Sequence, residues 1–230
     1  MTIKLELQGG VATLWLARPK KHNAFDGEML NKLEAAIAEV ETDAACRVLV
    51  LAGEGRSFCA GADLAWMASQ ASEGTAANLA SAERMGGIFH KLSNCTKPTI
   101  ARVHGAAMGG GVGLASACDF VVATSRAFFA LSEVRLGLVP GVISPFVVRR
   151  VGPAKARALF MLGDRVPGNA AERLGLVDEC VAHDDDLTAL DSAVGRIAAR
   201  LLKGGPEALY ACKQLVDGVQ YRDPGDVLSF

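Results

Sequence analysis

Residues 97–133 read KPTIARVHGAAMGGGVGLASACDFVVATSRAFFALSE, with three consecutive glycines at 109–111. The short apolar runs at 98–103 and 119–123 predict two buried strands, and the first of them contains several β-branched residues. Between these strands, the small residues at 112–118 predict a helix. The glycines therefore lie in a loop that leaves a strand and opens a helix.

This loop suits the binding of an oxygen atom that gains negative charge. Glycine adopts backbone conformations that other residues disfavour, and it lets a ligand approach the main chain closely. The N-terminus of a helix also presents unpaired N–H groups and a partial positive charge. A second loop of this kind, GEGRSFCAGADL at 53–64, runs into another expected helix.

The composition excludes several classes of protein. Half of the 230 residues are hydrophobic, 21% are charged, and the net charge is −1. These values favour a soluble globular enzyme, and they argue against a basic surface for nucleic acid. The six cysteines are widely spaced without a CxxC pair, and the N-terminus lacks the pattern of a secretory signal. We therefore expect reduced thiols in a cytoplasmic protein with no metal site and no membrane span.

The first half of the chain is expected to alternate between strands and helices. Alternating residues at 3–7 and 11–17 around a Gly-Gly turn predict a hairpin. Apolar residues at helical spacing predict a helix at 27–41, and a buried strand follows at 47–52. The segment 67–74 has the composition of a mobile loop and is a candidate lid over a substrate.

Helices dominate the remainder of the chain. We expect them at 75–94, 187–202 and 206–219, the last of which opens with a proline. Together the patterns predict an α/β fold closed by helices, with a core at 1–190 and a C-terminal helical segment at 191–230.

Three interpretations of the glycine loop are open. In the first, the glycines only permit close packing. The second is a dinucleotide fold, because GVG at 111–113 with Glu133 about twenty residues further on imitates its fingerprint. Ser116 stands where the third glycine of that fingerprint belongs, which counts against it. The third is an oxyanion hole, in which N–H groups from 61–63 and 109–111 converge on one carbonyl oxygen.

The motifs SFCAGADL, ARVHGAAMGGGVGLASACD and FALSEVRLGLVPG together resemble the crotonase superfamily, also called the enoyl-CoA hydratase/isomerase family. NAF near residue 23 and RLGLVDECV extend the resemblance over nearly the whole chain. These motifs are most similar to those of the methylglutaconyl-CoA hydratase-like branch. The resemblance implies a spiral of ββα units, a C-terminal helical region that is shortened here, and assembly as homotrimers or dimers of trimers.

The resemblance also implies acyl-CoA thioester substrates, so coenzyme A is part of the substrate and no other cofactor is expected. The N–H groups of Ala62 and Gly110 would form the oxyanion hole and stabilise an enolate-like intermediate. Residues of the basic loop RPKKHNAF at 18–25 and of the loop at 53–64 are expected to contact the coenzyme A part: Arg18, Lys21, Ala24, Ala60, Asp63 and Leu64. For the basic residues among them, a solvated turn is the alternative.

Hydratases of this family generally use two glutamates. The second corresponds to Glu133, and the first would stand at position 113, where this chain has Gly113. Family members with one glutamate at the Glu133 position include 3,2-enoyl-CoA isomerases. We expect hydration of a 2-enoyl-CoA, with isomerisation as the alternative and a non-catalytic acyl-CoA-binding protein as the alternative from another class. A surface ion pair with Arg135 is the structural alternative for Glu133.

Three other residues of a chemically useful type are expected to have structural roles. His104 lies at a strand end and is predicted to be a core histidine. Cys59 has no basic partner nearby in sequence and is predicted to serve packing. Asp63 is predicted to cap the helix that follows it.

Overall fold

The computed structural model describes residues 2–219, apart from the side chain of Ala71. Its larger sheet has six strands in the order β1-β2-β3-β5-β7-β10. All neighbours are parallel except the antiparallel pair β1 and β2, which forms the expected N-terminal hairpin. The strands are β1 (Ile3–Gln8), β2 (Val11–Leu16), β3 (Val48–Gly53), β5 (Thr99–Val103), β7 (Phe120–Thr124) and β10 (Glu179–Val181).

A second, smaller sheet has the order β4-β6-β8-β9, with β9 antiparallel to β8 and the other neighbours parallel. Its strands are three residues each: β4 (Ser57–Cys59), β6 (Ala106–Met108), β8 (Phe128–Ala130) and β9 (Arg165–Pro167). Along the chain, β3, β5 and β7 of the large sheet are each followed directly by a strand of the small sheet and then by helical chain. This repetition is the spiral of ββα units, and it confirms the predicted fold class.

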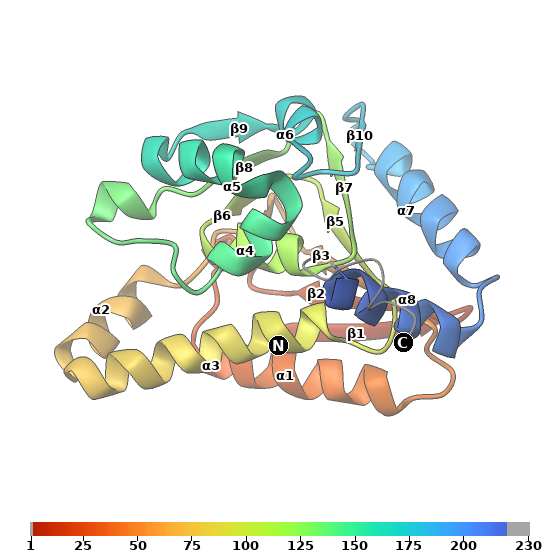
Figure 1. Cartoon of the computed structure of the whole chain (residues 1–230), viewed down its shortest axis with the longest axis horizontal. Helices are drawn as coiled ribbons and strands as arrows, with labels where there is room; N and C mark the ends of the chain where they lie inside the picture. The colour runs from red at the N-terminus through yellow and green to blue at the C-terminus, as the bar shows by residue number, and fades with distance from the viewer. Residues whose placement is uncertain (1, 220–230) are drawn as a thin grey trace.

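Helices cover both faces of the large sheet (Figure 1). On one face α1 and α3 lie side by side and α4 packs on α3 and α5, whereas α7 contacts β5, β7 and β10. Strand β3 shows why both faces are apolar, because Leu49 and Leu51 join the core beneath α1 while Val48 and Val50 face α7. The helices are α1 (Gly27–Thr42), α2 (Leu64–Ser72), α3 (Thr75–Ser93), α4 (Gly110–Ala117), α5 (Ser144–Leu162), α6 (Gly168–Leu174), α7 (Thr188–Leu201) and α8 (Pro206–Val219), with 3₁₀ turns η1 (Pro19–Lys21) and η2 (Glu133–Leu136).

The expectation of a mobile loop at 67–74 is wrong, because α2 occupies residues up to Ser72. Asp63 accepts a hydrogen bond from the Ala65 N–H at 3.0 Å, so the predicted N-cap is confirmed. The small Ala and Ser residues after it are compatible with a helix once the first turn is capped. The segment was expected to be mobile because most of its residues are small or polar. Such residues can nevertheless form a helix whose first turn is capped.

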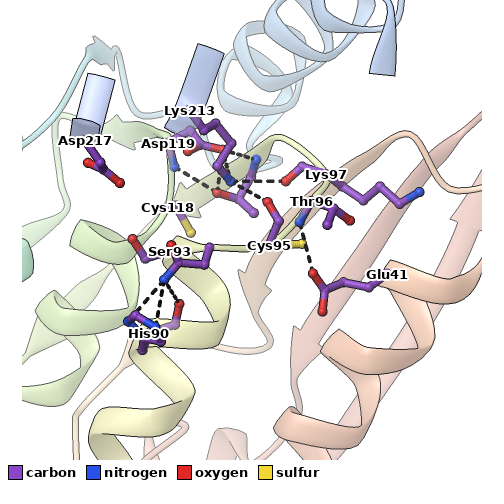
Figure 2. Close-up of polar contacts among 12 residues, drawn as sticks. Glu41, His90, Ser93, Cys95, Thr96, Lys97, Cys118, Asp119, Lys213 and Asp217 are labelled. Carbon is purple, nitrogen blue, oxygen red and sulfur yellow. Dashed lines mark hydrogen bonds and ion pairs between the residues drawn. The ribbon is translucent and has the colours of Figure 1, made fainter. Parts of the chain in front are cut away.

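The last described helix, α8, makes polar contacts with the rest of the chain (Figure 2). The ammonium of Lys213 lies 2.9 Å from Asp119 Oδ2 and donates to the Cys95 carbonyl oxygen at 2.8 Å. No residue of α8 is fully buried. The domain boundary expected between residues 190 and 191 falls inside helix α7. The division into a core and a C-terminal helical segment stays a prediction. None of the helices between residues 2 and 219 combines the length and apolarity needed to cross a bilayer.

Candidate active site

The carboxyl ends of three neighbouring parallel strands bring the predicted catalytic groups to one edge of the small sheet. β4, β6 and β8 are adjacent, and the chain continues from them to Ala62, Gly110 and Glu133 respectively. Ligands of α/β sheets commonly bind outside the carboxyl ends of parallel strands. Residues more than seventy positions apart in the sequence therefore meet at one site, as the resemblance implied.

Gly110 presents its N–H because it opens helix α4. The preceding residue, Gly109, has φ 49° and ψ −118°, a conformation that favours glycine, and it ends β6 with a hydrogen bond from its N–H to the Ala130 carbonyl oxygen at 2.8 Å. The first turn of a helix has no intrahelical acceptors for its N–H groups. The Gly110 N–H is therefore available at the positive end of the α4 dipole.

Ala62 presents its N–H because its neighbours make the bonds of a parallel bridge. The bridge pairs Phe25 with Ala62, and its hydrogen bonds run from the Phe25 N–H to the Gly61 carbonyl and from the Asp63 N–H to the Phe25 carbonyl, each 2.8 Å. Since the residues on either side of Ala62 supply both bonds, the Ala62 N–H points away from Phe25. Among residues 2–219 it donates to no backbone acceptor, so it can donate to a ligand.

The two donor loops are in direct contact. A Cβ atom added to Gly61, which has φ +86°, would lie 2.7 Å from the Met108 carbonyl oxygen and 3.1 Å from the Gly110 nitrogen. A Cβ on Gly111 would lie 2.1 Å from the Cys59 carbonyl oxygen. No side chain fits at either position without moving backbone, so the glycines are required for the close approach of the loops.

Glu133 lies beside these donors with a carboxyl group that is partly withdrawn from water. Its Oε1 atom is 3.1 Å from the position that a Cβ on Gly109 would take. Within residues 2–219, its buried Oε2 atom has no hydrogen-bond partner. Burial raises the pKa of Glu133 above the usual value for a glutamate. Arg135 pairs with Asp164 at 2.8 Å, so the alternative of a surface ion pair between Glu133 and Arg135 is wrong.

The place of the family's first glutamate is filled by apolar side chains. A Cβ atom on Gly113 would lie 2.3 Å from Ile143 Cγ2 and 3.3 Å from a ring carbon of Phe89. Both of these residues are almost fully buried. Position 113 therefore has neither a carboxylate nor the space for one.

The residues expected to contact coenzyme A meet where 18–26 crosses 60–64. Arg18 donates to the Ala24 carbonyl at 2.7 Å and lies 2.9 Å from Asp26 and 3.4 Å from Asp63. Three of the other residues complete this crossing: Lys21 Nζ lies 3.9 Å from Asp63, the Ala60 N–H donates to the His22 carbonyl at 2.9 Å, and Leu64 is 66% exposed. The Arg18 guanidinium is thus engaged within the protein, while Lys21 is exposed.

His104 and Cys59 lie in the core, as predicted, but only one ring nitrogen of His104 is satisfied, since its buried Nδ1 atom has no hydrogen-bond partner within residues 2–219. His104 is buried and shares a 2.9 Å hydrogen bond between its Nε2 and the Gly55 carbonyl oxygen. Burial lowers its pKa, which disfavours the charged form. Burial also raises the pKa of the Cys59 thiol to about 12, so Cys59 is a thiol and not a nucleophilic thiolate at neutral pH.

Three residues that shape the site were not singled out from the sequence. Asn23 is fully buried with φ 56°, and its Nδ2 donates to the carbonyl oxygens of Glu54, Ser57 and Phe58. Phe25 and Ile143 contact the loops described above. Asn23 and Phe25 carry a sequence signal, since they begin and end the NAF motif. Ile143 carries none, because buried Ile is a common core residue.

Comparisons with known proteins identify the family of this chain. The family model described as enoyl-CoA hydratase/isomerase matches residues 6–223. The crotonyl-CoA hydratase of Syntrophomonas wolfei is 35% identical over 200 residues, which cover 86% of this chain and 76% of that protein. The short-chain-enoyl-CoA hydratase of Clostridium acetobutylicum is 32% identical over 232 residues, covering 98% and 85%.

Solved structures give the same result for the fold. AtuE of Pseudomonas aeruginosa superposes with a TM-score of 0.94 at 36% identity, covering 100% of this chain and 88% of that chain. The spiral of ββα units and the match over nearly the full length lead to one assignment. This chain belongs to the enoyl-CoA hydratase/isomerase family, the crotonase superfamily.

Proposed function

We propose that this protein is an enoyl-CoA hydratase, a hydro-lyase that adds water to a 2-enoyl-CoA thioester. The observation that carries the proposal is the meeting of two free backbone N–H groups with one desolvated carboxyl group at the edge of the small sheet. The names of the curated relatives support the reaction type, since the two described above are hydratases.

In the proposed reaction, the Ala62 and Gly110 N–H groups donate to the thioester carbonyl oxygen. Glu133 removes a proton from a water molecule as the water oxygen bonds to the β-carbon, and the π electrons move to give an enolate held by the two donors. Glu133 then returns the proton to the α-carbon, so one water is added and the carboxylate is regenerated. An oxyanion donor of this kind contributes on the order of 10²–10³ in rate.

Isomerisation is the second candidate, and the filled space at Gly113 favours it. A single carboxylate suffices to move a proton between the α- and γ-carbons of a 3-enoyl-CoA, because no water has to be activated. The third candidate, a non-catalytic acyl-CoA-binding protein, needs the two N–H donors but does not need Glu133 to act as a base.

For the coenzyme A part, we propose contacts from the crossing of 18–26 and 60–64. The members of this set are Arg18, Lys21, Ala24, Ala60, Asp63 and Leu64, of which the exposed Lys21 is the best placed to reach a phosphate. For the acyl part, the candidate is the methylglutaconyl group, which rests on the resemblance of GGGVGLASACD and ALSEVRLGLVPG to that branch.

The test is a set of three absorbance assays on the purified protein. Crotonyl-CoA and methylglutaconyl-CoA lose their conjugated thioester absorbance when water is added, whereas a 3-enoyl-CoA gains it on isomerisation. A hydratase consumes at least one of the first two substrates. A gain with the 3-enoyl-CoA alone would make the protein an isomerase, and no change with any of the three would leave the binding protein.

A further inference from the structure

We infer that Phe25 is a positioning residue that sets the distance between the two oxyanion donors, the N–H groups of Ala62 and Gly110. The inference rests on the proposed function, because it takes these two groups to bind the thioester oxygen. Phe25 is only 1% exposed, so it acts through the two donor loops and not on the substrate.

The main chain of Phe25 holds the first donor loop. Its N–H donates to the Gly61 carbonyl and its own carbonyl accepts from the Asp63 N–H, each at 2.8 Å. These two bonds bracket Ala62 on both sides. Any shift of the Phe25 backbone therefore carries Ala62 with it.

The ring of Phe25 supports the second donor loop. A Cβ atom added to Gly110 would lie 2.4 Å from Phe25 Cζ and 2.8 Å from Cε1. The outer edge of the ring therefore lies directly against the main chain of Gly110. Since the backbone of this one residue holds Ala62 and its ring edge supports Gly110, the length of the side chain is the spacer between the two donors.

The surroundings of Phe25 prevent this spacer from drifting. The Phe89 ring packs edge-on against it, with centroids 6.4 Å apart and an interplanar angle of 69°. Asn23, two residues earlier, ties the same segment to the carbonyl oxygens of residues 54, 57 and 58, which precede the first donor loop. Because the ring is held on these sides, a shorter or longer side chain at position 25 should move the donor loops.

The chemical consequence is specific to the transition state. Both N–H groups have to meet one oxygen, and a misplacement of about 1 Å can cost on the order of 10²-fold in rate. Phe25 lies within the crossing proposed to contact coenzyme A, but it holds that crossing through main-chain bonds to Gly61 and Asp63, which a change of its side chain leaves in place. A change at Phe25 should therefore lower kcat by roughly 10–100-fold and alter KM little, which is the signature of a lost transition-state interaction.

The experiment measures how strongly the donors polarise a bound carbonyl. The parent protein is Glu133→Gln, which removes turnover, and the probe is 2,4-hexadienoyl-CoA, whose conjugated thioester absorbs at longer wavelength when its carbonyl oxygen accepts hydrogen bonds. Phe25→Leu shortens the side chain between the two donor loops. Phe25→Tyr adds an oxygen to Cζ, the ring atom nearest Gly110. Phe89→Leu is the matched control, since it removes an equally buried ring from the same aromatic pair.

We expect the parent protein to give the full red shift and both Phe25 variants to lose most of it. Phe89→Leu removes only one of the supports of the Phe25 ring and should lose a small part of the shift. A coenzyme A thioether without a carbonyl should bind all four proteins with similar affinity, which shows that the variants are folded. Where Phe25→Leu fails that control, Phe25→Met, whose unbranched side chain is closer to phenylalanine in length, replaces it.

Two results would overturn the inference. One is an undiminished red shift in both Phe25 variants, and the other is an equal loss in Phe89→Leu, which would make the effect one of general packing. Failure of the proposed function looks different, because the parent protein itself would then bind the probe without any red shift.

Discussion

Glu133, the proposed base, lies in an environment that is unfavourable to its own charge. Its Oε2 atom is buried and, among the residues that the structure describes, has no hydrogen-bond partner. Burial raises the pKa of the carboxyl group, so the ionised form is a stronger base than an exposed glutamate. Such groups cluster at functional sites, where a loss of stability is tolerated in exchange for activity.

Replacing Glu133 with glutamine should stabilise the protein at neutral pH. The folded pKa lies above the unfolded value of about 4.3, so between these two values the folded state binds more protons and the wild type loses stability as pH rises. Chemical denaturation of both proteins from pH 4 to 8 measures the difference. The gain in stability from the substitution should be largest at high pH and should vanish below the ordinary glutamate pKa. A constant difference across this range would contradict the origin in ionisation.

Restoring the family's first glutamate should require two substitutions. Gly113→Glu alone places its Cβ 2.3 Å from the buried Ile143 Cγ2. Overpacking of this kind typically costs about 1–3 kcal/mol. Combining it with Ile143→Ala should recover part of that loss, and denaturant titration of the two single variants and the double variant measures the coupling. Additive losses would show that the space at Gly113 is not limited by Ile143.

At the scale of elements, the site depends on three short strands ending side by side. β4, β6 and β8 are too short to be stable alone, and they are held by the longer strands that precede each of them along the chain. The contact of the donor loops then follows from glycines where a Cβ would overlap backbone atoms. The large sheet thus provides stability, and its short extensions provide the geometry.

The attachment of α8 is a separate feature that involves two of its charged side chains, Lys213 and Asp217, of which Asp217 pairs with Arg149 at 3.0 Å. Lys213 connects the helix to Asp119 and to two carbonyl oxygens, and its side chain is 13% exposed. Lys213→Ala should lower the free energy of unfolding by roughly 1.5–3 kcal/mol, the usual range for hydrogen bonds to charged groups. Hydrogen exchange should also accelerate within α8.

Lys91→Ala is the control for this prediction, because Lys91 pairs with Glu34 at the surface with both side chains at least 41% exposed. Exposed ion pairs contribute about 0–1 kcal/mol. Equal effects of the two substitutions on stability, or unchanged exchange in α8, would contradict the role given to Lys213.

The whole molecule presents an apolar surface next to the site. Its exposed members come from η2, the loop after it and the end of α5: Val134, Leu136, Leu138, Val139, Met161 and Leu162. Monomeric proteins rarely expose large contiguous apolar patches. We therefore predict a homo-oligomer, a trimer or a dimer of trimers, and sedimentation equilibrium should give a multiple of 24.0 kDa. A 24.0 kDa species at micromolar concentration would contradict this prediction.

The sequence predicted the large elements and the polar residues of the site, but not the packing around them. The strands at 98–103 and 119–123 and the helix at 206–219 were recognisable because long apolar or periodic runs reflect burial. The small sheet was missed, since a three-residue strand carries too few positions to show alternation. Phe25 and Ile143 were missed because their roles depend on contacts with Gly110 and Gly113, and a sequence pattern does not record such contacts.

If Glu133 alone performs the proton transfers of hydration, Glu133→Gln should lose most of the steady-state rate with crotonyl-CoA. General acid–base catalysis contributes on the order of 10²–10⁴-fold, so kcat should fall by that factor while crotonyl-CoA still binds. Glu41→Gln is the control, because Glu41 accepts a hydrogen bond from the Thr96 N–H at 3.0 Å away from the site. It should keep the wild-type rate. Hydration by Glu133→Gln within a few-fold of the wild-type rate would contradict the role of Glu133 as the base of hydration.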